Sequence, residues 1–413
     1  NGPEKLARTR HCTDDEVALL KPEADRPDDF VTRMQPLCKR ATDSLQQLGW
    51  RVVFAESCTA GLVSAALGSI AGISEHLCGS AVTYRNRTKH DWLEVPQEVL
   101  ENPGPVSEEV VQLMARGALD STEEANIALA VTGHLGPFAP AELDGLIHIG
   151  VAYQNQVADP ADKNSFAVSR FVRLKSNQRL SRQQEAAEEV LATLVDVMDV
   201  FQCWQKICQG EIEKGRFAWQ CHADASQSVV GYDSPKTPRY LFPGSYNPRH
   251  DGHLKIAQYV RSAFEVELEY ELSLANVDKP VLGFPETLHR LFQFIDNDVI
   301  WLTESATFAE KSRLFPQTTF VVGVDTIIRV ADPKYHSDEA AHREAIQTIL
   351  AAGCSFLVFG RQLNQDEADS AGFHELDDLT LPVELKEICQ QVPAAAFRCD
   401  ISSTELRARE LED

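Results

Sequence analysis

The chain has 413 residues, of which 43% are hydrophobic and 24% are charged. This length suits two domains of roughly 150 to 200 residues each, and the composition excludes a disordered or fibrous protein. Acidic residues outnumber basic ones by 62 to 39, so the net charge of −23 provides no basic face for a nucleic-acid backbone. We therefore expect small molecules, and not nucleic acids, as partners.

The ten cysteines form no CxxC pair and show no spacing typical of a secreted disulfide framework. Reduced thiols in the cytoplasm are the simpler interpretation. No apolar run approaches the roughly 20 residues that a membrane helix needs, and no signal-peptide pattern opens the chain. We expect a cytoplasmic protein without a membrane partner, and the sequence leaves both a homo-oligomer and the true N-terminus open.

The hydrophobic pattern divides the chain into two α/β halves. We expect a poorly ordered polar arm over residues 1–27, a first domain over 28–200, a linker over 201–238 and a second domain over 239–413. The linker is assigned where the periodicity fades and glycines and prolines interrupt the pattern.

Predicted strands and helices alternate in both halves. In the first half we predict helices over residues 28–49, 59–70, 107–119 and 180–200, and strands over 52–55, 81–84, 127–131, 146–152 and 166–174. In the second half we predict strands over residues 240–242, 266–274, 299–302, 319–322 and 356–359, separated by helical stretches. This alternation predicts a doubly wound parallel sheet in the second half, whereas the strand order of the first half cannot be read.

Two segments of the first half bring together residue types suited to acyl transfer. The segment AESCTAG (55–61) joins a strand to a helix and presents Ser57 on a turn. The segment VTYRNRTK (82–89) ends a strand with Tyr84 and starts a helix that carries Lys89. A neutral lysine or a tyrosinate could accept the serine proton, which would give an acyl-transfer site without histidine. The alternative is a helix-capping serine, a packed tyrosine and a surface lysine.

Residues 28–198 resemble the CinA C-terminal domain family, whose known activity is hydrolysis of the amide of nicotinamide mononucleotide. The resemblance rests on ESCTAGL (56–62), TYRNRTK (83–89), GPVSEE (104–109) and AVTG (130–133). It implies that Ser57, Tyr84 and Lys89 are catalytic. The chain departs from the family's glycine-rich TGIAGP loop, because it reads TGHLGPFAP (132–140), and the loss of glycines removes close backbone approach to a ligand phosphate. We interpret His134 as a loop residue and Cys58 as a packed side chain.

The second half contains a phosphate-binding pattern in two pieces. The segment FPGSYNPRHDGH (242–253) leaves the first strand and enters a helix, whose free N–H groups and positive dipole end favour an anion. His250 and His253 are three residues apart, so one helical turn places both imidazoles on one side. The second piece, ISSTELR (401–407), is another junction with hydroxyls at a helix start and Arg407 one turn later. Alone, the histidine pair could be a helix cap and a surface residue.

Residues 239–410 resemble the HxGH nucleotidyltransferase superfamily, and in particular nicotinamide mononucleotide adenylyltransferase. VGVDT (322–326) and LVFGR (357–361) resemble further segments of that branch, and NVDKP (276–280) and TF (307–308) match a divergent, eukaryote-like subgroup. The resemblance implies catalytic roles for His250 and His253. It implies nucleotide-binding roles for Gly244, Ser245, Gly323, Asp325, Arg361, Ser402, Ser403, Thr404 and Arg407. Asp325 alone could equally be a helix cap, and Arg361 a solvated loop cation.

Together the two resemblances predict a bifunctional enzyme of pyridine-nucleotide salvage. The second half would use ATP with Mg²⁺ to adenylylate nicotinamide or nicotinate mononucleotide, and the first half would deamidate nicotinamide mononucleotide. We assign no metal-ligating residues. Two alternatives stay open: transfer from ATP or CTP to another small phosphorylated acceptor, and a first half that is a non-catalytic sensor or assembly module.

Overall fold

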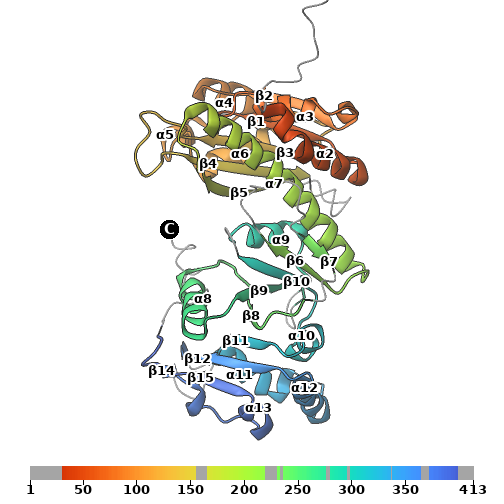
Figure 1. Ribbon diagram of the computed structural model, residues 1–413, viewed down its shortest axis with the longest axis vertical. Helices are drawn as coiled ribbons and strands as arrows, with labels where there is room; N and C mark the ends of the chain where they lie inside the picture. The colour runs from red at the N-terminus through yellow and green to blue at the C-terminus, as the bar shows by residue number, and fades with distance from the viewer. Residues whose placement is uncertain are drawn as a thin grey trace, which may run out of the picture.

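The computed structural model describes residues 30–154, 165–218, 230–232, 236–275, 280–294, 298–335, 337–363 and 372–398. The expected arm, residues 1–27, and the ISSTELR segment lie outside the described residues. The mixed α/β architecture is confirmed, with two large sheets and one small two-stranded sheet (Figure 1).

The first sheet is mixed and has the strand order β2-β1-β3-β4-β5. β1 is parallel to β2 and β3, whereas β4 is antiparallel to β3 and β5. Its strands are β1 (Val52–Glu56), β2 (Leu77–Val82), β3 (Ile127–Gly133), β4 (Leu146–Gln154) and β5 (Ser165–Arg173). Its helices are α2 (Phe30–Leu48), α3 (Leu62–Gly68), α4 (Asn86–Leu93), α5 (Gln97–Glu101), α6 (Glu108–Asp120) and α7 (Arg179–Cys208), with a 3-10 turn at Ile73–Glu75.

Helices cover both faces of this sheet. α6 packs its buried residues Val111 and Met114 against the small side chains Ala128 and Ala152 of β3 and β4. The other face is covered by α2, α3 and α7, whose apolar side chains join a larger core. β1 and β3 are therefore buried nearly continuously along their length, as expected for central strands covered on both faces.

The second sheet has the strand order β15-β12-β11-β8-β9-β10-β6-β7. Its six strands from β15 to β10 are all parallel, whereas β6 and β7 are antiparallel additions beyond β10. The strands are β6 (Lys214–Ala218), β7 (Val230–Tyr232), β8 (Tyr240–Pro243), β9 (Leu268–Ser273), β10 (Val299–Thr303), β11 (Thr319–Gly323), β12 (Ser355–Phe359) and β15 (Cys389–Val392). The helices are α8 (Asp251–Phe264), α9 (Phe284–Leu291), α10 (Phe308–Leu314), α11 (Val324–Ala331), α12 (Glu339–Ala351) and α13 (Val383–Glu387). Two 3-10 turns (Pro333–Tyr335, Leu376–Asp378) and the small sheet of β13 (Arg361–Leu363) and β14 (Gly372–His374) complete this half.

This order confirms the predicted doubly wound parallel sheet. Counted from β8, the parallel strands run 3-2-1-4-5-6 in reverse, with the direction of winding changing between β8 and β11. In such sheets ligands bind beyond the carboxyl ends of the strands at that switch point. The carboxyl ends of β8 and β11 carry Gly244 and Gly323, two of the predicted nucleotide-binding residues.

The segment that we expected to be a linker, 201–238, contains regular structure in its described part. α7 does not end near residue 200 but continues to Cys208, and β6 pairs with the edge of the second sheet. At 1.5 Å per residue the 30 residues of α7 span about 45 Å. The linker was predicted because glycines and prolines interrupt the local hydrophobic pattern. β6 and β7 form all the same, because they pair with neighbouring strands of the second sheet.

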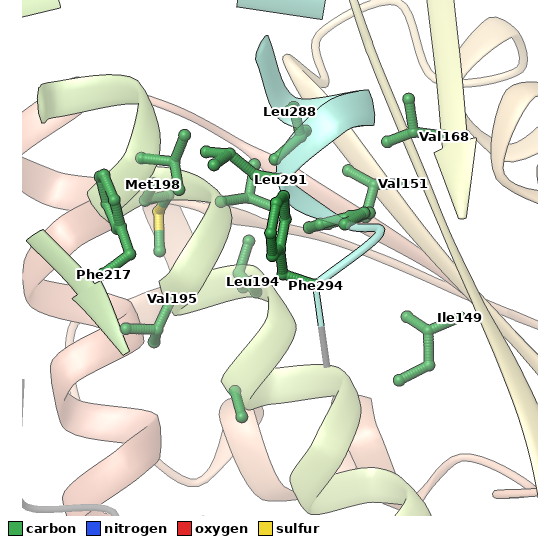
Figure 2. Close-up of a cluster of buried hydrophobic side chains, with 14 of the residues drawn as sticks. Ile149, Val151, Val168, Leu194, Val195, Met198, Phe217, Leu288, Leu291 and Phe294 are labelled. Carbon is green, nitrogen blue, oxygen red and sulfur yellow. The ribbon is translucent and has the colours of Figure 1, made fainter. Parts of the chain in front are cut away.

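A continuous apolar core joins the two halves. α9 packs against α7 and β5, and Figure 2 shows Leu288 and Leu291 of α9 beside side chains from the first sheet and α7. Phe284, at the start of α9, is fully buried, and its ring lies 5.2 Å from that of Tyr153 and 5.0 Å from that of Phe201. No helix among the described residues has the length and apolar character needed to cross a membrane.

Candidate functional site

A turn held by a buried carboxylate positions Ser57. Glu56, the last residue of β1, is fully buried, and its two oxygens accept hydrogen bonds from the residues that follow. The donors are Thr59 Oγ1, the N–H groups of Gly61, Val63 and Ser64, Ser64 Oγ and Ser80 Oγ. Glu56 thus replaces the missing carbonyl partners at the start of α3 and fixes the turn. We had not singled out Glu56, although an acid at the end of an apolar strand was a usable signal.

Lys89 is placed to act on Ser57. Its Nζ donates to Ser57 Oγ at 3.0 Å and to the Thr83 carbonyl at 3.1 Å, and the side chain is 2% exposed. Burial lowers the pKa of Lys89 to about 8, so about a tenth of it is the free amine at pH 7, far more than for an exposed lysine. The surface-lysine alternative is therefore wrong, and the pair has the geometry of a nucleophile beside its base.

Tyr84 lies in the same pocket but bonds elsewhere. It is half exposed, and its hydroxyl accepts a hydrogen bond from Arg179, the first residue of α7. Arg179 also donates to the Gly136 carbonyl at 2.6 Å. Tyr84, Arg179, Ser57 and Lys89 line one pocket of about 260 Å³. Arg179 was not predicted, because it lies 95 residues from Tyr84 and no local motif marks it.

The loop TGHLGPFAP (132–140) forms another wall of this pocket. The backbone of His134 pairs with that of Leu146 and Gly145, at 2.9 Å in both bonds, and its side chain lines the pocket. Phe138 is fully exposed at the pocket's edge. Cys58 also lines the pocket, but burial raises its pKa to about 12, so it stays a thiol. This agrees with a packed Cys58.

In the second half, the two predicted histidines cap α8. His250 Nδ1 accepts the Gly252 N–H at 3.1 Å, and His253 Nδ1 accepts the His250 N–H at 3.2 Å. The two rings lie 3.9 Å apart. Because Nδ1 is the acceptor in each ring, the proton of each neutral imidazole resides on Nε2, inferred from these bonds.

Both histidines are held neutral. Burial, together with His250 and two arginines, lowers the pKa of His253 to about 3. Burial and the charge of Arg361 lower the pKa of His250 as well. A neutral imidazole with its proton on Nε2 can donate a hydrogen bond to a ligand. It does so without the desolvation cost of a charged imidazolium. The helix-cap alternative and the donor role are thus compatible, since one nitrogen caps the helix and the other carries the proton.

Asp325 and Arg361 form an ion pair at the ends of neighbouring strands. Arg361 NH1 lies 2.9 Å from Asp325 Oδ2, and Arg361 also influences the pKa of both histidines. Neither residue behaves as the alternatives supposed, because Asp325 is paired and does not cap α11, and Arg361 is not solely solvated. A Cβ at Gly323 would approach Asp325 Oδ1 to 2.4 Å, which explains the glycine.

A second pocket, of about 330 Å³, opens beyond the ends of β8, β9 and β10. Gly244 and Ser245 line it on one side, and the apolar residues Leu274, Phe308 and Ile346 line much of the rest. A Cβ at Gly244 would meet the Tyr246 ring at 2.6 Å, so only glycine fits there. Glu271 and Lys311, which we did not predict, also line this pocket. The sequence did contain a signal for Glu271. Glu269 and Glu271 alternate with apolar residues along the buried parallel strand β9, and such strands are normally apolar.

Four predicted residues cannot be placed in this site. Ser402, Ser403, Thr404 and Arg407 lie outside the described residues. Their convergence with His250 and His253 around one triphosphate therefore stays a prediction. Among the described residues no group of three or more His, Cys, Asp or Glu side chains could hold a metal ion.

Comparison with known proteins finds similarity in the first half. The family model of the CinA C-terminal domain matches residues 34–198. A CinA-like protein of Syntrophobacter fumaroxidans is 44% identical over 95 residues, which are 23% of this chain and 22% of that protein. A nicotinamide-nucleotide amidohydrolase, PncC, of Enterobacter agglomerans is 42% identical over 105 residues, which are 25% of this chain and 63% of that protein.

Among solved structures, the competence/damage inducible protein CihA from Agrobacterium tumefaciens is 33% identical. The match covers 42% of this chain and 98% of that one, with a TM-score of 0.36. The matches cover only 22 to 30% of the length of three such relatives, a putative competence-damage inducible protein and two CinA-like proteins.

Proposed function

We propose that this chain, whose residues 34–198 match the CinA C-terminal domain model, hydrolyses the amide of a nicotinamide nucleotide in its first half. The observation that carries this proposal is the buried hydrogen bond between Lys89 Nζ and Ser57 Oγ at the wall of a pocket. The relative named nicotinamide-nucleotide amidohydrolase supports the substrate class. The loop TGHLGPFAP lacks the glycines that would let its backbone approach a phosphate closely. We therefore expect other residues, such as Arg179, to contact the phosphate of the substrate.

The proposed reaction has two steps. The free amine of Lys89 takes the Ser57 proton while Oγ attacks the amide carbonyl, and ammonia leaves with a proton returned by the ammonium of Lys89. The resulting ester is then cleaved by water, which restores the serine and releases the acid. Tyr84, held by Arg179 in the same pocket, is placed to orient the substrate or to relay the proton.

Ammonia release from nicotinamide mononucleotide tests this proposal. We expect the wild-type chain to release ammonia and Ser57→Ala to lose at least about a thousandfold in rate, as other serine nucleophiles do. Ser69→Ala, at the far end of α3, is the matched control and should keep full activity. No release by the wild-type chain would favour the sensor or assembly alternative instead.

For the second half we propose adenylyl transfer from ATP, with its accompanying Mg²⁺, to nicotinamide or nicotinate mononucleotide. The support is the pair of neutral histidines at the carboxyl end of β8, next to the switch point of a doubly wound sheet. Adenylyl transfer needs positioned donors more than covalent chemistry, because the acceptor phosphate is already a nucleophile. The described residues offer no metal cage, so we expect Mg²⁺ to arrive as part of the nucleotide substrate.

Pyrophosphate release with each nucleoside triphosphate and each acceptor tests the transfer. We expect dinucleotide from ATP and a mononucleotide, and a loss of about 100-fold to 1000-fold in kcat in His253→Ala. His289→Ala, on α9, is a control histidine outside the cluster. A preference for CTP, or for another phosphorylated acceptor, would instead support the alternative of nucleotidyl transfer to a different small phosphorylated molecule. No pyrophosphate with any pair would remove the transferase proposal.

A further inference from the structure

The floor of the pocket beside β9 contains a buried ion pair with one oxygen that has no donor. Glu271 is 1% exposed, and its Oε1 accepts from Lys311 Nζ at 2.6 Å and from the Thr303 hydroxyl. Its Oε2 is buried and has no hydrogen-bond partner among the described residues. A buried acceptor without a donor is costly, so its presence at a pocket wall requires an explanation.

The neighbouring carboxylate on the same strand has no unmatched oxygen. Glu269 lies two positions earlier on β9, so it points to the same side of the strand. Its Oε1 accepts from Arg216 and Lys236, and its Oε2 accepts from Trp301 at 2.6 Å. Glu269 does not line the pocket, whereas Glu271 does. Of these two glutamates, only Glu271, which lines the pocket, has a carboxylate oxygen without a hydrogen-bond donor among the described residues.

Lys311 provides the complementary group. An ammonium has three N–H donors, and Glu271 Oε1 and the Ser305 carbonyl, at 2.6 and 2.8 Å, account for two of them. Lys311 lines the same pocket, and 6% of its side chain is exposed. The residues that line this part of the pocket therefore include, side by side, a carboxylate with one unpartnered oxygen and an ammonium, with no net charge.

We propose that Glu271 and Lys311 select an uncharged carboxamide on the acceptor and reject the corresponding carboxylic acid. This inference rests on the transferase proposal for the identity of the acceptor. On binding, the Glu271 carboxylate turns so that Oε2 reaches the pocket and accepts from the amide nitrogen, and the amide oxygen accepts from Lys311 Nζ. A carboxylate has no proton to donate, so it places its negative oxygens against Glu271. The second half therefore adenylylates the amide mononucleotide, which is the same molecule that the first half consumes.

Direct binding tests the selectivity without turnover. In a Ser57→Ala background, which stops conversion of amide into acid, titration calorimetry without ATP compares nicotinamide mononucleotide with nicotinate mononucleotide. The binding that changes on Glu271→Gln belongs to this pocket, since the first half contains a separate site. We expect at least a tenfold preference for the amide, which Glu271→Gln reduces to within about threefold because the glutamine NH₂ can donate to the acid. Glu269→Gln, which removes an equally buried carboxylate, should leave the ratio unchanged.

The outcomes separate this inference from the transferase proposal. Amide binding that depends on Glu271, without any pyrophosphate release on adding ATP, would remove the transferase and retain the selectivity. Equal affinity for both mononucleotides, a preference for the acid, or no binding sensitive to Glu271 would overturn the inference. If Glu271→Gln does not fold, the amide-to-acid ratio of pyrophosphate release in the parent protein decides in the same way.

Discussion

Burial of Lys89 makes the protein less stable and makes its amine reactive. Its pKa of about 8 in the folded chain is below that of an exposed lysine, so folding disfavours the charged form. The unfolded chain binds more protons between about pH 8 and the usual lysine pKa. The cost is therefore fully present below pH 8 and disappears as the pH rises through that window.

We accordingly predict that Lys89→Met stabilises the protein while it abolishes ammonia release. The free energy of unfolding at pH 7 should rise by about 1 to 3 kcal/mol, and the gain should shrink toward pH 10. Urea denaturation at several pH values measures this. Lys39→Met removes an exposed lysine of α2 and should change neither quantity. A less stable Lys89→Met protein would show that the hydrogen bonds of Lys89 to Ser57 and Thr83 outweigh the cost of burying its charge.

The same residue predicts the pH dependence of the wild-type reaction. Because the free amine is the base, kcat/KM for ammonia release should increase as the pH rises through about 8 and then level off.

At the level of elements, close approach of α6 to β4 fixes the first sheet. A Cβ at Gly150 would lie 2.4 Å from the Val111 carbonyl, so this helix can sit on the sheet only above a glycine. We predict that Gly150→Ala lowers the free energy of unfolding by about 1 to 3 kcal/mol, measured in urea. Gly68→Ala, in α3, meets only Leu77 at 3.8 Å and should be neutral or slightly stabilising. Equal effects of the two substitutions would contradict this account.

Sequence patterns predicted those elements whose signal is local. The helix starting near His250 and the turn at Ser57 follow from motifs of a few residues, and the parallel sheet follows from the alternation of strands and helices. The pairs Tyr84–Arg179 and Asp325–Arg361 could not be predicted, because each joins residues far apart in the chain. β6 and β7 were missed for a related reason, since they gain their stability from pairing with β10 and each other.

At the scale of the whole molecule, α7 and α9 connect the two proposed sites. α7 begins with Arg179 in the pocket of Ser57 and ends beside β6, β7 and α9 (Figure 1). The segment that leads into α9 contributes Leu282 to the other pocket, and the Leu282 carbonyl accepts a hydrogen bond from Trp204 of α7 at 3.0 Å. One wall of the second pocket is thus held by the first half.

The shared core also limits how such a chain can evolve. Phe284, Leu288 and Leu291 form an apolar surface that is buried in the shared core. If the halves were separated, this surface would be exposed to water and would favour aggregation or binding to another protein. Gene fission would give two fragments with exposed apolar surfaces. Recombination that exchanged one half would require a replacement domain whose surface is complementary to these three side chains. Separating the two halves is therefore unfavourable once α9 has packed against the first half, whatever reactions the halves carry out.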